Sequence, residues 1–329
     1  MKRKFWVILW ISLLFISFYS MPILMNQSDD SMAEMKSSTE KQVTVYIKKE
    51  RKLVTIPVQD YISDVIRQFV TSTDSDELIQ LLCILCRTKV YKYAAVYGAS
   101  PNPAHPGYDF CDDENCCFAF DSQYYTQSSG ESNLDLSAAY MLSKKIKKSL
   151  EATDEKVIYY HDQLIEPFFC KSNWGHTKLD LTYPYLQSID SPDWEVTEKI
   201  ENETFLTKET IYKQLKKTYV DFQWEKISIA PDVQVNSYYE DGSVNMVQVG
   251  NQLLTGEVFM KEFHLTSPCF EIKNSFSNKV KVISYGEGDG KGVSLAGAKV
   301  LLNRGYSAVD VIDYYFSQVS VKNFYFNQE

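Results

Sequence analysis

The first regular pattern of the chain alternates between apolar and polar positions. It runs through "QVTVYIKKERKLVTIPV", Gln42 to Val58, on both sides of a charged KKERK turn. Because successive side chains of a strand point to opposite faces, the alternation predicts a half-buried β-hairpin. The period then changes to that of a helix with one buried face, carried by Tyr61, Val65, Ile66 and Phe69.

A second helix is predicted from "STDSDELIQLLCILCRTKVYKYAAVY". Ser72 or Thr73 is expected to cap it, with Asp76 or Glu77 in the first turn. Residues 78–85 are apolar nearly all round, so we expect this helix to lie at the centre of the core.

The same helix carries a CxxC pair, Cys83 and Cys86. A redox pair and half of a zinc site are the functional interpretations of this spacing. However, the pair lies inside a Leu/Ile run, with no glycine, proline or adjacent base to lower a thiol pKa. We therefore expect both cysteines to pack as small apolar side chains.

Later patterns mix the two types of element and predict an α+β fold of helices and antiparallel strands. "SAAYMLSKKIKKSL" is an amphipathic helix, and "KVIYYHDQLIEPFFCKS" predicts two short strands around a His-Asp-Gln turn. A region from about 194 to 261 adds a helix at "KETIYKQLKKTY" and strands at "WEKISIA" and "SVNMVQVG". We interpret this region as a second lobe or an insertion.

The amino terminus has a membrane pattern. Lys2, Arg3 and Lys4 precede a mostly apolar run over residues 5–25, which is long enough to cross about 30 Å of hydrocarbon as a helix. A cleaved signal peptide is the alternative, but no small-residue cleavage site follows the run. We predict a signal anchor with residues 1–4 in the cytoplasm, a flexible stalk over 26–41, and an extracytoplasmic body over 42–329, which makes this a single-pass protein of the cell membrane.

Charge narrows the range of partners. The chain has 34 basic and 43 acidic side chains, a net charge of −9, and no basic stripe. Attraction to a nucleic-acid backbone is therefore not expected.

The densest chemistry lies in "HPGYDFCDDENCC". His105, Cys111, Cys116 and Cys117 supply the four soft donors that a closed structural zinc site requires, although their spacing differs from paired CxxC knuckles. Acidic residues among them, such as Asp109, could favour the approach of a cation. A disulfide from Cys111 to Cys116 or Cys117 is equally consistent with the spacing outside the cytoplasm.

Four blocks in order resemble the stage II sporulation protein D family, also described as the SpoIID/LytB domain. They are "IPVQDYISDVIRQFVTSTDSDELIQLLCILCRTKVY", "HPGYDFCDDENCC", "VIYYHDQLIEPFFCKSNWGHT" with "YPYLQSIDSP", and "YGEGDGKGVSLAGAKVLLNRGYSAVDVIDYYFS". The resemblance covers most of the chain after the stalk and implies a two-lobed body with a cleft. It also implies a structural zinc on His105, Cys111, Cys116 and Cys117, in which Cys116 replaces the second histidine of the family pattern.

Active members of that family are peptidoglycan lytic transglycosylases, in which a glutamate of an EMP motif is the general acid/base. Without a gap, Phe69 occupies that position, and a phenyl ring cannot transfer a proton. Asp289 and Leu295 replace a histidine and a glutamine of the fourth block. We therefore predict no catalytic residue, while a relocated carboxylate at Asp289, Glu114 or Glu166 remains the alternative.

Residues that keep the family types imply retained substrate binding; those we assign to it are Arg87, Ser172, Thr177 and Ser294. The implied function is peptidoglycan remodelling during sporulation and engulfment, with glycan strands, the membrane and other sporulation or cell-wall proteins as partners and without cleavage. An active lytic transglycosylase is the alternative. A redox or metal-buffering protein built on the cysteines is a third hypothesis.

Overall fold

A computed structural model describes most of the predicted body and part of the region before it. The described residues are 40–100, 104–113, 116–118, 136–196, 201–223, 233–274 and 279–325. The predicted membrane segment 5–25 and nearly all of the stalk 26–41 lie outside them. Among the residues that are described, no helix has the length and apolar character needed to cross a membrane.

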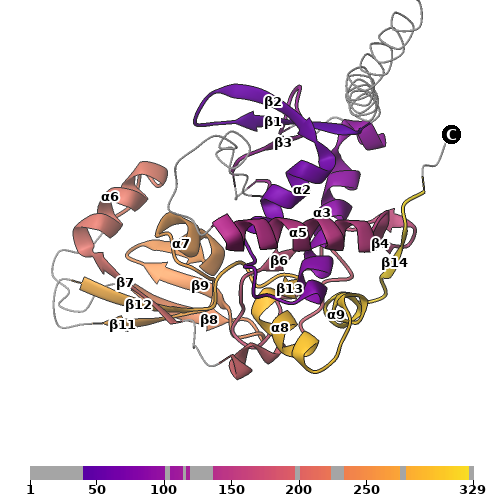
Figure 1. Ribbon diagram of the computed structural model, residues 1–329. Helices are drawn as coiled ribbons and strands as arrows, with labels where there is room; N and C mark the ends of the chain where they lie inside the picture. Colours follow the sequence, from indigo (N-terminus) through magenta and orange to yellow (C-terminus); the bar gives the residue numbers. More distant parts are fainter. Residues whose placement is uncertain are drawn as a thin grey trace, which may run out of the picture.

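Helices and mostly antiparallel sheets are mixed along the chain, which confirms the α+β class (Figure 1). Strands β1 (Gln42–Ile47) and β2 (Lys52–Pro57) pair antiparallel, as the alternating pattern predicts. Strand β1 buries every second side chain, Val43, Val45 and Ile47. Strand β3 (Phe110–Cys111) runs parallel along the other edge of β1, where Tyr46 is the partner of Cys111.

Helix α2 (Val58–Arg67) buries Tyr61, Val65 and Ile66, as predicted. It ends before Phe69, although Phe69 was expected to continue the helical face. The Phe69 N–H donates to the Ile66 carbonyl at 2.9 Å, so the chain tightens into a turn there. Phe69 therefore lies beyond the helix end and is only partly buried.

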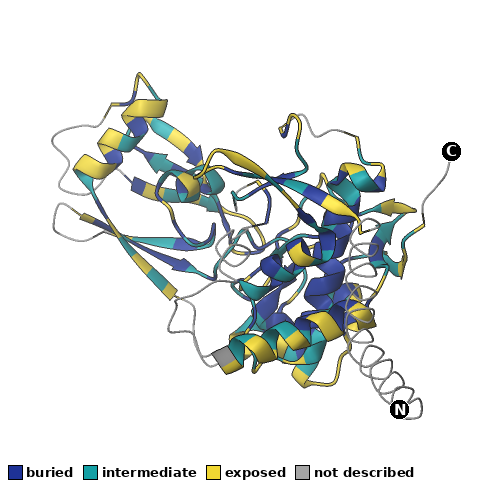
Figure 2. Ribbon diagram, turned by 45° about the horizontal axis from the view of Figure 1, so that its top comes forward, coloured by how far each residue is buried: buried dark blue, intermediate teal, exposed yellow. Residues whose placement is uncertain are grey.

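Helix α3 (Asp76–Tyr93) is capped by Ser75, whose hydroxyl accepts from the Leu78 N–H at 3.2 Å. The prediction of Ser72 or Thr73 as the cap was wrong, because residues 71–74 form a turn in which the Asp74 carboxylate accepts from the Thr71 N–H. The expected central position is confirmed, since α3 is buried on nearly all sides (Figure 2).

Both cysteines of the CxxC are buried in α3. Burial raises the pKa of the Cys83 thiol to about 12 and that of Cys86 further, so neither has the character of a reactive thiolate. Their predicted role in packing is confirmed.

The remaining elements around α3 close the larger hydrophobic cluster. Helix α5 covers α3, and β14, β4 and β5 form a sheet in that order around the predicted His-Asp-Gln turn. Two short 3-10 helices, η1 and η2, lie in the connections. The bounds are η1 Ala95–Tyr97, α5 Leu136–Ala152, β4 Lys156–Tyr160, β5 Gln163–Leu164, β6 Phe169–Cys170, η2 Pro192–Glu195, β13 Val293–Ser294, α8 Leu295–Asn303, α9 Ala308–Tyr315 and β14 Ser320–Asn323.

A second, separate cluster of buried apolar side chains is drawn from residues 206–282. Its two antiparallel sheets have the orders β11-β12-β7 and β10-β9-β8 and lie on the left of Figure 1 with α6 and α7. The bounds are β7 Glu201–Thr207, α6 Lys208–Thr218, β8 Val233–Tyr238, β9 Val244–Val249, β10 Gln252–Thr255, α7 Gly256–Glu262, β11 Phe270–Asn274 and β12 Lys279–Tyr285.

This second cluster reaches beyond the range 194–261 that the sequence indicated for a second lobe. The predicted helix at 208–219 and the strand at 243–250 are confirmed as α6 and β9. The predicted strand "WEKISIA" lies outside the described residues, and the division of the chain into lobes with a cleft stays a prediction.

Candidate functional site

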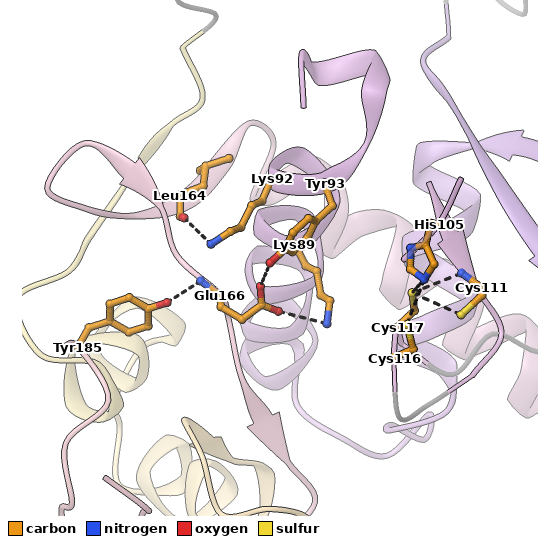
Figure 3. Close-up of polar contacts among 10 residues, drawn as sticks. All are labelled: Lys89, Lys92, Tyr93, His105, Cys111, Cys116, Cys117, Leu164, Glu166 and Tyr185. Atoms are coloured by element: carbon orange, nitrogen blue, oxygen red, sulfur yellow. Dashed lines mark hydrogen bonds and ion pairs between the residues drawn. The ribbon is translucent and has the colours of Figure 1, made fainter. Parts of the chain in front are cut away.

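The strongest concentration of soft donors is the His-Cys cluster formed by His105, Cys111, Cys116 and Cys117. One donor atom of each lies within 4.8 Å of the others (Figure 3). His105 Nε2 is 3.0 Å from Cys116 Sγ and 3.7 Å from Cys117 Sγ, and the sulfurs of Cys111 and Cys117 are 3.7 Å apart. Three of the four side chains are buried, and Cys116 is exposed.

The cluster fits a metal ion better than a disulfide. Two thiolates on one tetrahedral zinc lie about 3.8 Å apart, and a thiolate and an imidazole about 3.5 Å apart. The observed sulfur–sulfur separation of 3.7 Å is close to the first value, and the separations of 3.0 and 3.7 Å between His105 and the two cysteines lie on either side of the second. A disulfide would need about 2.05 Å between sulfurs, and the three cysteines are free thiols. The four residues could therefore hold a metal ion, and the predicted ligands are brought together.

Carboxylates between the ligands anchor the loop to the sheet. Asp109 accepts from the backbone N–H of Thr44 at 2.7 Å and from that of Ala95 at 2.8 Å. Asp112 accepts from the Lys48 N–H at 3.0 Å. These contacts give Asp109 a structural role that adjacency in sequence could not show, while its effect on an approaching cation stays a prediction.

Burial raises the pKa of the Cys117 thiol well above its ordinary value, and the neighbouring cysteines raise it further. The hydrogen bond from the Cys111 N–H acts in the opposite direction. The pKa of the more exposed Cys116 is also raised, first by burial and then by Cys111. A metal must therefore displace thiol protons when it binds.

Phe69 is linked to this cluster through aromatic rings. Phe69 packs edge to face on Phe169, with ring centroids 5.0 Å apart. Phe169 in turn lies 5.4 Å from Phe118, the residue that follows Cys117. The loop with the His-Cys cluster and the position of Phe69 thus share one packed neighbourhood.

Phe69 also borders open space. A depression of about 540 Å³, here called the Phe69 depression, is lined by Phe69, Lys171, Glu195 and Lys299 among others. Glu195 is its only acidic lining residue among the described part of the chain, and that carboxylate forms an ion pair with Arg304. The ring therefore lies where a ligand could reach it.

Residues 46–160 match the family model described as "Stage II sporulation protein". Two curated relatives, each called stage II sporulation protein D, are similar over most of the chain. The protein from Bacillus subtilis (strain 168) is 23% identical over 312 residues, 90% of this chain and 84% of the relative. The protein from Bacillus amyloliquefaciens is 23% identical over 291 residues, 85% and 78% of the two chains.

The family model and the two relatives together support membership of the stage II sporulation protein D family. The His-Cys cluster and Phe69 itself lie in the part that the family model matches, whereas most residues that line the Phe69 depression lie beyond it. Membership indicates a role related to sporulation. The resemblance predicted from the four blocks is confirmed.

Two of the three alternative acids, Glu166 and Asp289, lie among the described residues, and both make polar contacts. Glu166 is buried, accepts from the Tyr93 hydroxyl, and forms an ion pair with Lys89 at 3.2 Å (Figure 3). Burial and the bond to Glu166 raise the pKa of Tyr93 far above its ordinary value, so Tyr93 remains a donor. Asp289 accepts from the Lys291 N–H at 3.0 Å, and burial raises the pKa of its carboxyl. Glu114 lies outside the described residues.

Arg87, predicted to bind substrate, is fully buried. Its guanidinium donates to the carbonyls of Thr153 at 2.6 Å, Leu150 at 3.2 Å and Lys156 at 3.3 Å. These contacts fasten the end of α5 to α3.

The other three predicted substrate-binding residues are buried as well. Ser172 accepts from the Glu287 N–H, Thr177 donates to the Gln187 carbonyl at 2.7 Å, and Ser294 caps α8. Ser172 borders a second depression, described below. Their role in substrate binding stays a prediction.

Sequence reasoning missed Asp193, which organises the same region. Its carboxylate accepts from Ser294 Oγ at 2.5 Å, Ser191 Oγ at 2.5 Å and the Asn173 N–H at 2.8 Å. Burial raises the pKa of this carboxyl, opposed by the hydroxyl donors. Asn173 and Ser294 lie far from Asp193 in the sequence, and Ser191 carries no motif. The local sequence therefore marks Asp193 only by its position after "SP".

Proposed function

We propose that this family member is a membrane-anchored, extracytoplasmic protein of peptidoglycan remodelling during sporulation and engulfment that binds glycan strands or partner proteins without cleaving them. The observation that carries the proposal is Phe69, an aromatic ring at the wall of a depression where the family pattern has its general acid. Glycosidic cleavage needs a carboxyl that can donate a proton, and a phenyl ring has none to give.

The surroundings of Phe69 support the absence of cleavage. The carboxylate in the same depression, Glu195, is held by Arg304, and Glu166 is buried between Lys89 and Tyr93. An acid in either position would first have to leave these partners. Binding remains supported, because the depression is open and its lysines and glutamate can bond to sugar hydroxyls.

We assign a structural zinc ion to the His-Cys cluster, with His105, Cys111, Cys116 and Cys117 as ligands. When bound, zinc would neutralise the thiolates and close the loop as a cross-link. The buried ligands and the anchoring by Asp109 support a structural role over the redox hypothesis. Thiol titration and metal analysis test it: about one zinc that resists mild oxidants is expected.

One observation favours the alternative of an active lytic transglycosylase. Glu195 lines the Phe69 depression, and 38% of its side chain is exposed. If Arg304 moved away, this carboxylate could face a bound glycan. The two functions are therefore separated by whether Glu195 is needed for any product.

The test incubates the full-length protein in detergent micelles with denuded glycan strands and follows anhydro-muropeptides. We expect none from the wild type or from Phe69→Gln, which matches the length of glutamate but cannot act as an acid. Phe69→Glu should form product, by about 10²-fold or more over the wild type, if the depression binds glycan. Steady product from the wild type that Glu195→Gln abolishes would overturn the proposal.

A further inference from the structure

A second depression, of about 340 Å³, lies between the two hydrophobic clusters and is here called the Trp depression. Its walls come from the segment after β6, from η2, from the start of β7 and from the end of β12. The lining includes Ser172, Trp174, Asp193, Trp194, Glu201 and Tyr285. Two indoles, a phenol and two carboxylates thus surround one space, in a kind of junction where ligand sites are common.

Trp174 is fixed in place. Its indole N–H donates to the Asp241 carbonyl at 2.6 Å, so it is tied to the turn between β8 and β9. Gly290 makes room for the ring, because a Cβ there would come within 2.3 Å of it. This indole therefore links the segment after β6 to the turn between β8 and β9.

Trp194 differs, because 65% of the residue is exposed. Its backbone is nevertheless held, since the preceding Asp193 accepts from Ser191, Ser294 and the Asn173 N–H. Because the backbone of Trp194 is already held, the exposed indole loses little conformational entropy when a ligand covers it.

The Trp depression and the Phe69 depression are adjacent. Both are lined by Val196 and by Ala296, near the start of α8. A ligand that fills both must be extended and made of linked units. A glycan strand has this form.

We propose that the Trp depression binds one neutral sugar ring of such a strand, next to the unit that lies over Phe69. The flat faces of the indoles match the C–H faces of a sugar ring, and the carboxylates of Asp193 and Glu201 can accept from its hydroxyls. The same carboxylates repel an anionic ligand. This inference rests on the proposed function of glycan binding and names the residues that perform it.

The test titrates a neutral β-1,4-linked N-acetylglucosamine tetramer into the full-length protein in detergent micelles by calorimetry. Trp194→Ala should weaken binding about tenfold, and Trp194→Phe should recover most of it. The matched control is Tyr140→Ala on α5, since Tyr140 is 67% exposed and lies outside the Trp depression. A sulfated tetramer should bind about tenfold more weakly than the neutral one.

The outcomes separate this inference from the proposed function. Equal affinity in the wild type and Trp194→Ala would overturn the Trp subsite while glycan binding stood, and equal affinity for both tetramers would overturn the role of the carboxylates. If no variant and no wild type bound the tetramer or denuded strands, both proposals would fall. Should Trp194→Ala not fold, Glu201→Gln decides: the subsite requires weaker binding, and unchanged binding rejects it.

Discussion

The His-Cys cluster and the Phe69 depression share one row of aromatic rings, yet they depart from the family pattern in opposite ways. Where the resemblance predicts a histidine, the cluster has Cys116, and the four donors lie within 4.8 Å of one another. Where it predicts an acid, the chain has Phe69, and the carboxylates of Glu166 and Glu195 are paired with cations. The four donors could therefore hold a metal ion, whereas a phenyl ring cannot transfer a proton.

The difference follows from what each chemistry demands. A tetrahedral metal site needs soft donors at fixed distances, and thiolate and imidazole are both acceptable. Proton transfer needs an ionisable group at one position, and an apolar side chain cannot approximate it. Metal binding also contributes to folding, so its loss affects the whole protein, whereas the loss of an acid affects only the reaction.

The largest effect is expected from breaking the cluster. Cys111→Ser should remove the metal and lower the free energy of unfolding by about 4 kcal/mol, the contribution of a ligand present at about a thousand times its dissociation constant. Thermal melting with metal analysis measures both. Cys83→Ala is the control, because it alters a buried thiol of α3 outside the cluster and should keep the metal. Normal metal content in Cys111→Ser would exclude Cys111 as a ligand.

A smaller effect is expected at the other end of the aromatic row. Phe69→Ala should destabilise the protein by about 2 to 3 kcal/mol, below the cost at a fully buried phenyl ring, because Phe69 is partly buried. Chemical denaturation measures the change, and metal content should stay normal. Phe69→Leu keeps most of the volume and should cost less than about 1.5 kcal/mol. A loss of metal in Phe69→Ala would mean that the two regions are not separable.

The next largest effect is expected at Asp109, which supports the loop of the His-Cys cluster. Asp109→Asn leaves one acceptor oxygen for two backbone N–H groups, those of Thr44 and Ala95. We expect a loss of about 1 to 2 kcal/mol in unfolding free energy and weaker metal binding, since the ligands on either side become less ordered. Asp162→Asn, at the exposed turn between β4 and β5, is the control. Unchanged metal affinity would reduce Asp109 to a role in stability alone.

The pH dependence should distinguish the cluster from Phe69, because only the cluster contains groups that titrate. Burial raises the thiol pKa values of Cys116 and Cys117, so the metal-free thiols hold their protons at neutral pH. Metal affinity should therefore rise about tenfold, or about 1.4 kcal/mol, per pH unit for each proton released, and fall on acidification. Competition with a chromophoric chelator between about pH 6 and 8 measures the slope. A metal affinity that does not change with pH would contradict thiol ligation. Phe69 has no ionisable group and contributes nothing to this dependence.

Much of the fold and of the candidate site was predictable where the signal is local. The β1–β2 hairpin, helix α3 and the four donors of the cluster follow from period, apolar runs and residue type. The predictions of helix ends were wrong where neighbouring groups compete to set the local backbone conformation. Ser75, and not Ser72 or Thr73, caps α3 because Asp74 draws the preceding residues into a turn. Phe69 falls beyond α2 for a similar reason, a turn that closes on Ile66.

By itself, the amino-acid sequence determined which chemistry is possible: four soft donors in one loop and no acid at position 69. Only the tertiary structure decided which groups meet. It paired Glu195 with Arg304, buried Glu166 beside Lys89, turned Asp109 toward β1, and placed two depressions next to each other at Ala296. The physical reason is that ionisation, metal ligation and ligand contact depend on distances of a few ångströms between residues that lie far apart along the chain.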